Sequence, residues 1–503
     1  MTDMTWTPNQ IAVFDWVKNG KGNAIIEAVA GSGKTTTLVE LLKYATGYVA
    51  LCAYNKKMGD ELKARTAGMK GVYAGTLHSF GFKALLFARK STGLKVDDNK
   101  VYDIINTLLS EDEAKFYGAF IRRLVGLAKD TGIGFFTPID DRQAWQDIID
   151  HHDLSLENDF GSYDDAISWA IQVLKRSNEI KNVIDFGDMI YHVLVHGVRV
   201  LQHDFVLVDE AQDTNATRRA LARKLLKAKG RLIAVGDPHQ AIFGFTGADN
   251  DSLDLIRKDF NAITLPLTVS FRCPKSVVAH ARNWVDHIEP CDTAIEGSVS
   301  TMEYADLLAN AKGMNLSQDN AILCRKNAPL VELAFTLIRQ GIPCRMEGRD
   351  IGMQLVRLAG KWKVKRLDAL TNRLTAFRDR EVQKAQAKGN DVKAEQIDDR
   401  CGCLFVLIER AEEKGLDVAG LQDMIKDMFA DTDPNKPSNI LVLSSVHKAK
   451  GLEWKNVMIL GREQFMPSQW ARQEWQQDQE TNLIYVAVTR AQETLVEIVN
   501  VPE

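Results

Sequence analysis

The chain has 503 residues, a formal net charge of −4 at pH 7, and ordinary shares of hydrophobic (45%) and charged (26%) residues. This length predicts several globular units, because a single hydrophobic core stops growing well below it. No apolar run approaches the roughly 18 residues of a membrane-spanning helix, and the N-terminus lacks the basic and apolar regions of a signal peptide. The composition argues against a membrane or secreted protein. It predicts a cytoplasmic one, with association with the nucleoid and a phage origin left open.

The seven cysteines are odd in number and scattered along the chain, which suits a reducing compartment. Cys401 and Cys403 form the one close pair, and no second pair or histidine lies near them in the sequence. We therefore expect ordinary thiols there rather than a zinc site. The small net charge says little about partners, so a nucleic-acid-binding surface would have to be a local basic patch.

A glycine-rich loop is the most informative feature of the N-terminal region. An apolar strand at residues 24–26 precedes it and a helical stretch at 36–44 follows it, although its first position is Ala28 where the usual pattern has glycine. Such a loop points successive backbone N–H groups at a phosphate chain, while Lys34 reaches the β- and γ-phosphates and the Thr35 hydroxyl ligates Mg²⁺. The sequence therefore predicts an ATP site. The predicted contacts in this loop are Ala30, Gly31, Ser32, Gly33, Lys34, Thr35 and Thr36.

Residues from about 85 to 185 show mainly helical periodicity. Near the end of this stretch, residues 185–187 match the Asp-Phe-Gly tripeptide of protein kinases. No kinase catalytic loop or kinase glycine loop accompanies it, so the kinase interpretation fails.

Two further apolar runs place polar side chains at strand ends. The run 205–208 ends in Asp209 and Glu210, and the run 232–235 leads to Gln240. Continuous apolar runs are typical of buried parallel strands, and ligands collect at the carboxyl ends of such strands. Asp209 is placed to hold Mg²⁺, Glu210 to accept a proton from the attacking water, and Gln240 to contact the γ-phosphate.

Two aromatic residues, Phe243 and Phe245, follow Gln240 and alternate with glycine. One interpretation is a hydrophobic hairpin in the core. The other, which the glycines favour, is a pair of exposed rings on which single-stranded nucleic acid stacks.

The C-terminal half predicts a second α/β unit, with strands at residues 321–324, 440–443 and 457–460. Residues 351–436 interrupt it with a helical pattern. From Arg357 to Gln396 this insertion has 11 Lys and Arg against 5 Asp and Glu. A solvated helix face and a contact with duplex DNA explain this surplus equally well.

Ordered short blocks from Gln10 to Leu495 resemble superfamily 1 helicases of the UvrD/Rep/PcrA type. Within this group they are most similar to the helicase core of the eukaryotic F-box DNA helicase and its phage and bacterial relatives, although no F-box is apparent. The resemblance implies an α/β fold with two RecA-like, parallel-sheet P-loop NTPase domains, each with a mainly helical insertion. The implied domains are 1–84 with 186–268 (1A, ATP binding), 85–185 (insertion 1B), 269–350 with 437–503 (2A), and 351–436 (a small insertion 2B).

The resemblance also implies roles for individual residues. Gln10 would read the adenine, Phe271 would stack on it, and Glu453 would contact the ribose. The implied catalytic set is Lys34, Asp209, Glu210, Gln240, Arg272 and, as the arginine finger, Arg490. The implied DNA contacts are Tyr54, Asn55, Lys56, Thr76, His78, Phe80, Phe243, Phe245, His447 and Trp454.

The chain departs from the family pattern in two blocks. Phe245 and Thr246 stand where motif III usually has Trp and Arg, and Thr481 and Asn482 stand where motif VI usually has two arginines. These changes leave the nucleotide chemistry untouched but predict weaker coupling between DNA and the ATP site.

The implied activity is that of a DNA-dependent ATPase that uses ATP and Mg²⁺ to move along single-stranded DNA and unwind duplex at single-strand/double-strand junctions. Movement from 3′ to 5′ is implied by the resemblance alone. One alternative is a translocase that strips bound proteins from DNA with little unwinding. Another is the motor subunit of a helicase–nuclease complex, with the nuclease on a separate chain. Replication or recombination proteins are possible partners, and the sequence is silent on oligomeric state.

Overall fold

The structure is a computed structural model. It describes residues 5–89, 93–152, 154, 156, 161–244, 247–249, 251–347, 349–387, 391–429, 440–469 and 471–502. The chain forms two compact units, Met1–Thr268 (unit 1) and Val269–Glu503 (unit 2). No helix in the described parts of either unit is long and apolar enough to cross a membrane.

Unit 1 is built on a six-stranded sheet in which every neighbouring pair is parallel. In sheet order the strands are β3 (Val72–Thr76), β2 (Val49–Ala53), β6 (His203–Val208), β7 (Leu226–Gly236), β1 (Asn23–Ala28) and β8 (Ala262–Leu267). The predicted apolar runs at 24–26, 205–208 and 232–235 are the central strands β1, β6 and β7. Their runs are continuous because both faces of a central parallel strand are buried.

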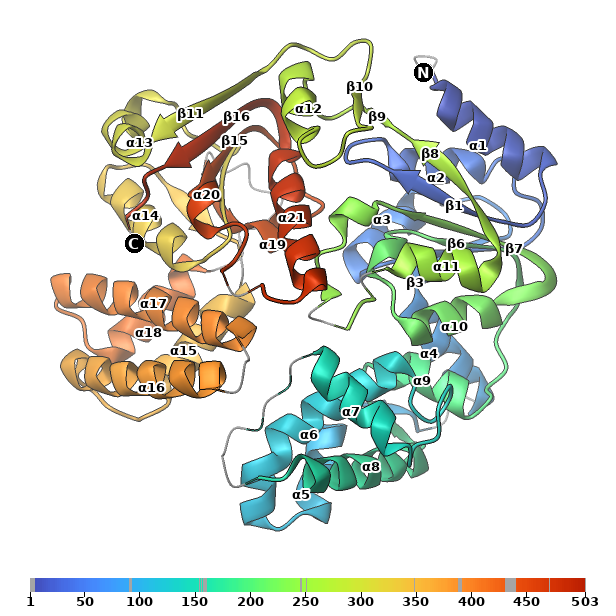
Figure 1. The fold of residues 1–503 in the computed structure, drawn as a ribbon, viewed down its shortest axis with the longest axis horizontal. Helices are drawn as coiled ribbons and strands as arrows, with labels where there is room; N and C mark the ends of the chain where they lie inside the picture. The colour runs from blue at the N-terminus through green and yellow to red at the C-terminus, as the bar shows by residue number, and fades with distance from the viewer. Residues whose placement is uncertain are drawn as a thin grey trace. The chain divides into compact units, whose positions relative to one another are not determined.

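Helices cover both faces of this sheet (Figure 1). They are α1 (Pro8–Asn19), α2 (Lys34–Leu41), α3 (Lys56–Arg65), α4 (Leu77–Ala88), α9 (Asp188–Val195), α10 (Ala216–Lys224) and α11 (Ser252–Phe260). Alternate residues of β6 enter different apolar clusters, with Val206 and Val208 on one face and Phe205 and Leu207 on the other. The sheet is therefore the middle layer of an α/β sandwich.

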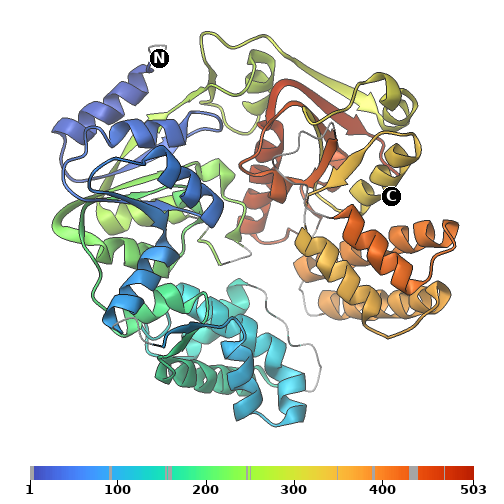
Figure 2. The same ribbon diagram turned by 180° about the vertical axis from the view of Figure 1, so that it is seen from behind.

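The insertion of unit 1 is a small helical bundle, coloured cyan to green in Figures 1 and 2. Its helices are α5 (Lys100–Leu108), α6 (Glu111–Thr131), α7 (Arg142–His151) and α8 (Tyr163–Glu179), with a short ladder of β4 (Lys95–Val96) and β5 (Val183–Ile184) at its base. A capping box between Ser110 and Glu113 starts α6, and Gly132 in the left-handed region ends it. The predicted boundary after residue 84 falls inside α4, which continues to Ala88.

Unit 2 has a second all-parallel, six-stranded sheet. In sheet order the strands are β11 (Ser298–Glu303), β16 (Ala491–Val499), β15 (Trp454–Leu460), β12 (Asn320–Cys324), β14 (Leu441–Ser445) and β13 (Cys344–Met346). Its helices are α12 (Lys275–Ala281), α13 (Tyr304–Asn310), α14 (Ala328–Arg339), α19 (Val446–Ala449), α20 (Arg462–Phe465) and α21 (Glu474–Val488). The predicted strands at 321–324, 440–443 and 457–460 are β12, β14 and β15.

The insertion of unit 2, orange in Figure 1, consists of α15 (Arg349–Gly360), α16 (Leu367–Ala387), α17 (Asp391–Glu413) and α18 (Val418–Met428). Cys401 and Cys403 are buried free thiols on α17. Across the described residues, no group of three or more His, Cys, Asp and Glu side chains is arranged to hold a metal ion. The fold class is therefore as predicted, with two parallel-sheet α/β units that each contain a helical insertion.

Candidate nucleotide and DNA sites

The loop between β1 and α2 has the backbone of a phosphate cradle. Gly31 and Gly33 have φ of 74° and 75°, a region that side chains with a Cβ rarely adopt. The Ser32 hydroxyl is buried there and has no hydrogen-bond partner among the described residues. Lys34 starts α2, so the predicted loop residues lie at a helix N-terminus that faces an anion favourably.

The two predicted carboxylates follow β6 directly. The Lys34 ammonium lies 3.1 Å from one carboxylate oxygen of Glu210 and 3.2 Å from the other. Glu210 has φ of 50°, a left-handed backbone that is costly for a non-glycine residue and is typical of functional sites. Asp209 is buried, and its Oδ2 has no hydrogen bond within the described residues.

The electrostatics of this cluster suit a metal ion and a phosphate chain. Burial, and then the neighbouring Glu210 carboxylate, raise the pKa of Asp209. Burial lowers the pKa of Lys34, but Glu210, Asp237 and Asp209 outweigh it, and the net pKa is raised. Asp209 offers an unused, buried anionic oxygen, so the residues present fit Mg²⁺ held together with phosphate oxygens.

A hydrogen-bond network extends the site to the end of β7. Gln212 donates to the Glu210 carboxylate, and its own oxygen accepts from the Asp237 backbone N–H at 3.1 Å. Gln240 donates to Asp237 Oδ2 at 2.6 Å. Sequence reasoning named Gln240 but missed Gln212 and Asp237, although both lie inside the motifs from which Glu210 and Gln240 were read.

Gln10 lies on α1 and is buried. Its amide oxygen accepts from the Thr7 backbone N–H at 3.0 Å in a capping box, and its amide nitrogen donates to the Thr37 hydroxyl at 3.0 Å. Thr37 is on α2, so Gln10 connects the N-terminal helix to the helix that follows the phosphate loop.

Unit 2 contains a second cluster of predicted nucleotide contacts. Arg272 Nε donates to Glu453 Oε2 at 2.6 Å, and Gln492 donates to the other oxygen of Glu453 at 2.9 Å. Arg272 also donates to the Thr489 carbonyl at 3.3 Å. The neighbouring Phe271 is 47% exposed, which leaves ring surface for a base.

Arg490, the predicted arginine finger, is directed into unit 2. Its side chain is only 1% exposed and donates to the backbone carbonyls of Val486 at 2.9 Å and Leu452 at 3.1 Å. A role at the γ-phosphate stays a prediction, and it requires the guanidinium to leave these carbonyls.

Two aromatic pairs lie among the predicted DNA contacts of unit 1. Tyr54 stacks on Phe243 with ring centroids 6.0 Å apart and an interplanar angle of 10°. His78 stacks on Phe186 with centroids 4.1 Å apart and an angle of 21°. Phe186 is 55% exposed and was not predicted. The sequence feature that could have indicated Phe186 is its place in the Asp-Phe-Gly-Asp block, where an aromatic residue lies between two carboxylates.

Other predicted DNA contacts have local structural roles. The Asn55 side chain caps α3 by accepting from the Met58 N–H, and the Thr76 hydroxyl caps α4 by accepting from the Ser79 N–H. Lys56, in the first turn of α3, is exposed. Burial, and then Arg325, lower the pKa of His447 to about 3, so its ring is neutral at pH 7.

Two predicted DNA contacts are buried. Phe80 is 9% exposed and packs in the core of unit 1, and Trp454 is 8% exposed at the start of β15. Burial leaves little of either ring for a base, so a DNA contact at either residue stays a prediction and neither is used in the proposed DNA site. Phe245 lies outside the described residues.

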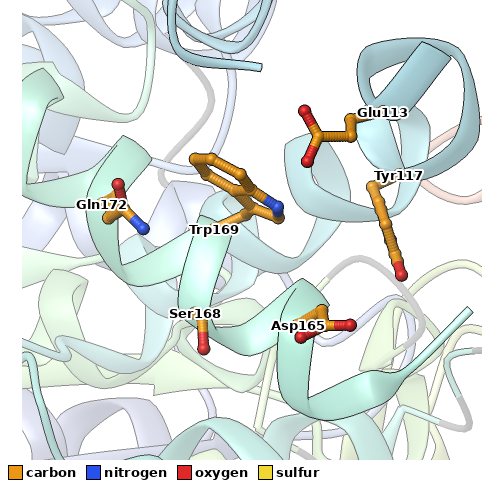
Figure 3. Close-up of a pocket in the computed structure, with 6 residues that line it drawn as sticks. All are labelled: Glu113, Tyr117, Asp165, Ser168, Trp169 and Gln172. Carbon is orange, nitrogen blue, oxygen red and sulfur yellow. The ribbon is translucent and has the colours of Figure 1, made fainter. Parts of the chain in front are cut away.

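A separate cavity of about 410 Å³ lies in the insertion of unit 1. Figure 3 shows the Trp169 indole of α8 with Gln172 on one side and with Glu113 and Tyr117 of α6 on the other. None of the predicted site residues lines it.

A phosphate loop, paired carboxylates at a strand end, and parallel α/β sheets together define a P-loop NTPase. Comparison with known families refines this class. Residues 10–261 match the UvrD/REP helicase N-terminal domain, and residues 357–501 match the UvrD-like helicase C-terminal domain. The chain belongs to the UvrD/REP helicase family, and its activity is that of an ATP-driven DNA helicase.

Individual relatives are distant but cover most of the chain. It is 22% identical to the ATP-dependent DNA helicase PcrA of Staphylococcus aureus strain Mu50 in an alignment of 604 positions, gaps included, which covers 95% of this chain and 81% of the relative. It is 21% identical to the ATP-dependent DNA helicase PcrA of Staphylococcus epidermidis strain RP62A in an alignment of 599 positions, with the same coverage.

Proposed function

We propose that this protein binds ATP with Mg²⁺, translocates along single-stranded DNA, in the 3′-to-5′ direction, and unwinds duplex at single-strand/double-strand junctions. One observation carries the proposal. The sheet of unit 1 is all parallel, so the residues that follow β1, β6, β7, β2 and β3 gather at one edge. Lys34, Asp209 and Asp237 follow the first three strands, Tyr54 follows β2, and Thr76 ends β3. ATP groups and candidate DNA groups therefore share an edge.

The chemistry of the site follows from these residues. The loop before α2 receives the phosphates, and Lys34 neutralises their charge. Mg²⁺, held by Thr35 and Asp209, would polarise the γ-phosphate. Glu210 orients and deprotonates the attacking water, with Gln212 fixing the direction of its carboxylate. An arginine finger is worth ~10³–10⁵ in rate, and Arg490 is the residue predicted for that role.

Aromatic rings hold the single strand by stacking on its bases. A base on an aromatic side chain is worth about 1–3 kcal/mol, close to the mean of about 1.4 kcal/mol for one duplex stacking step. A ring such as Phe243 can thus replace one lost base stack without holding the strand too tightly for movement.

The test compares Glu210→Gln and Lys34→Ala with the wild type and with Glu179→Gln, a surface carboxylate in an exposed ion pair. Both site variants should lose ATP turnover and keep binding to single-stranded DNA, and the control should behave as wild type. Substrates with 3′ or 5′ single-stranded tails then report polarity. Robust hydrolysis by either site variant would overturn the assignment of the ATP site, and unwinding only from 5′ tails would overturn the direction.

A second candidate is a translocase that removes proteins from single-stranded DNA with little unwinding. The observation that favours it is the small second insertion, whose four helices share one core with the sheet of unit 2. Strand displacement and protein displacement, measured side by side, separate the two functions. A motor subunit of a helicase–nuclease complex would show its full activity only with its partner chain, as would a motor that works with replication or recombination proteins.

A further inference from the structure

Arg218 contacts both the segment that follows Glu210 and one of the candidate DNA rings of unit 1, Tyr54. It is on the first turn of α10, whose N-cap Asn215 accepts from the Arg218 backbone N–H at 2.9 Å. Its guanidinium Nη1 donates to the Asp213 carbonyl at 2.9 Å, and its central carbon is 5.5 Å from the centroid of the Tyr54 ring. Asp213 ends the short 3-10 turn that follows Glu210 directly.

The two adjacent arginines of α10 have different charged partners. No carboxylate in the described parts of the chain forms an ion pair with Arg218, whereas the next residue, Arg219, pairs with both Asp249 and Asp259. The side chain is half-buried, so one part contacts protein and another faces solvent. A guanidinium in this state offers several unused N–H donors in a planar fork, the geometry that matches a phosphate.

The groups near Arg218 are two aromatic rings, Tyr54 and His78, and the carboxylates of Asp130 and, beside Tyr54, Asp213. Burial, and then the charge of Arg218, lower the pKa of His78 to about 3, which leaves that ring neutral and free to stack. Of the two carboxylates, that of Asp130 accepts through Oδ1 from Asn215 Nδ2 at 2.8 Å. Burial raises the pKa of Asp130 to about 6, although Arg218 lowers it. Asp130 thus has a hydrogen-bond partner of its own, and in the described residues it forms no ion pair with Arg218.

We propose that Arg218 binds a backbone phosphate of single-stranded DNA and, through the Asp213 carbonyl, reports the presence of DNA to the segment that carries Glu210. The inference deepens the proposed function and rests on it. Rings that stack bases leave the phosphates of the same strand to be met by cations, and the Tyr54–Phe243 pair has Arg218 on its Tyr54 side. When a phosphate takes some of the guanidinium N–H donors, the bond to Asp213 must adjust.

The experiment compares Arg218→Gln with Arg223→Gln in the full-length protein. Both changes remove one arginine from α10, but Arg223 lies over the Phe260 ring at 4.3 Å, away from the Tyr54 pair. The probe is an oligothymidylate, with binding measured from 50 to 200 mM salt and ATP turnover measured against oligonucleotide concentration.

For Arg218→Gln we expect the slope of log K against log salt to fall by about 0.7, the value for one phosphate contact on a single strand. We also expect a higher oligonucleotide concentration at half-stimulation and a lower DNA-stimulated kcat. A merely structural role would change Tm without changing the salt slope. Arg218→Lys should restore the slope, because the charge returns, but not the full stimulation, because the planar fork that bonds Asp213 is gone.

Arg223→Gln should match the wild type in slope and stimulation. If Arg218→Gln and Arg223→Gln have the same salt slope and the same stimulation, the inference is overturned while the proposed function stands. If wild-type ATP turnover does not respond to oligothymidylate at all, it is the proposed function that fails.

Discussion

The two helical insertions are attached to their sheets in different ways. In unit 1 the insertion has an apolar cluster of its own, built from α5 to α8 with Tyr191 of α9. In unit 2 the residues of α15 to α18 belong to the same apolar cluster as Ile322 of β12 and Leu443 of β14. One insertion is a separate folding core, and the other is an extension of its sheet domain.

Polar contacts reinforce this contrast. Lys129 of α6 pairs with Asp185 at 2.5 Å and with Asp188 at 2.7 Å, and Lys100 of α5 pairs with Asp188 at 2.7 Å, all deep in the protein. The first insertion is thus held to α9 by a few buried charges. A buried ion pair is costly to break, because removing one member leaves an unpaired charge in the interior.

The largest expected effect comes from Lys129→Ala, which leaves Asp185 and one oxygen of Asp188 buried without their cation. We expect a loss of about 3–5 kcal/mol in the free energy of unfolding of unit 1, measured by urea denaturation. The control is Lys95→Ala, which removes an exposed pair with Asp97 and should cost about 0–1 kcal/mol. Equal losses from the two variants would show that the buried charges do not attach the insertion.

A matched pair of core variants tests the difference between the two cores. Leu124 of α6 and Leu404 of α17 are both fully buried, and Leu→Ala at either should cost about 2–5 kcal/mol. The effects should spread differently. Hydrogen exchange in Leu404→Ala should rise in β12 and β14 as well as in the insertion, while in Leu124→Ala it should rise only in α5 to α8. Faster exchange in β6 or β7 of Leu124→Ala would contradict a separate core.

The smallest expected effect is a pH dependence of the attachment in unit 1. His192 of α9 is buried, and its ring lies 3.3 Å from Asp188 Oδ1. Burial, and then Lys100 and Lys129, lower its pKa to about 2 against an ordinary value of 6.5. As the pH falls, the His192 ring is therefore protonated in the unfolded state before it is protonated in the folded state. The free energy of unfolding has its full value above pH 6.5 and decreases as the pH falls towards 2.

Between pH 6.5 and 5 this group alone should lower the free energy of unfolding by about 2 kcal/mol, at about 1.4 kcal/mol per pH unit. His192→Gln should reduce the slope, measured by urea denaturation at pH 7.5 and pH 5. A slope unchanged by this substitution would assign the acid sensitivity to other groups.

The structural elements and site residues that depend on a local sequence pattern could be predicted. Central strands such as β1 and β6 are continuous apolar runs, and the phosphate loop and the carboxylates lie at fixed offsets from them. The sequence could not show which ring is exposed, because a motif position carries no information on packing. Phe80 and Trp454 were predicted DNA contacts and are buried, while Phe186, which was not predicted, is exposed.

The hydrogen-bond partners of a side chain were harder still to predict from the sequence. Gln212 matters because its amide faces Glu210 and Asp237, which come together only when β6 and β7 are neighbours. The edge strand β11 was not predicted, since none of its residues is buried and they show no apolar run.

The left-handed backbone at Glu210 lowers the stability of the fold at a position where the chemistry needs a glutamate. A glycine or asparagine would occupy that conformation with less strain, and strain of this kind amounts to about 1–3 kcal/mol. Selection for thermostability alone would therefore remove the glutamate and yield a sturdier but inert protein. A thermostable variant of this motor has to gain its stability elsewhere in the chain and leave position 210 as it is.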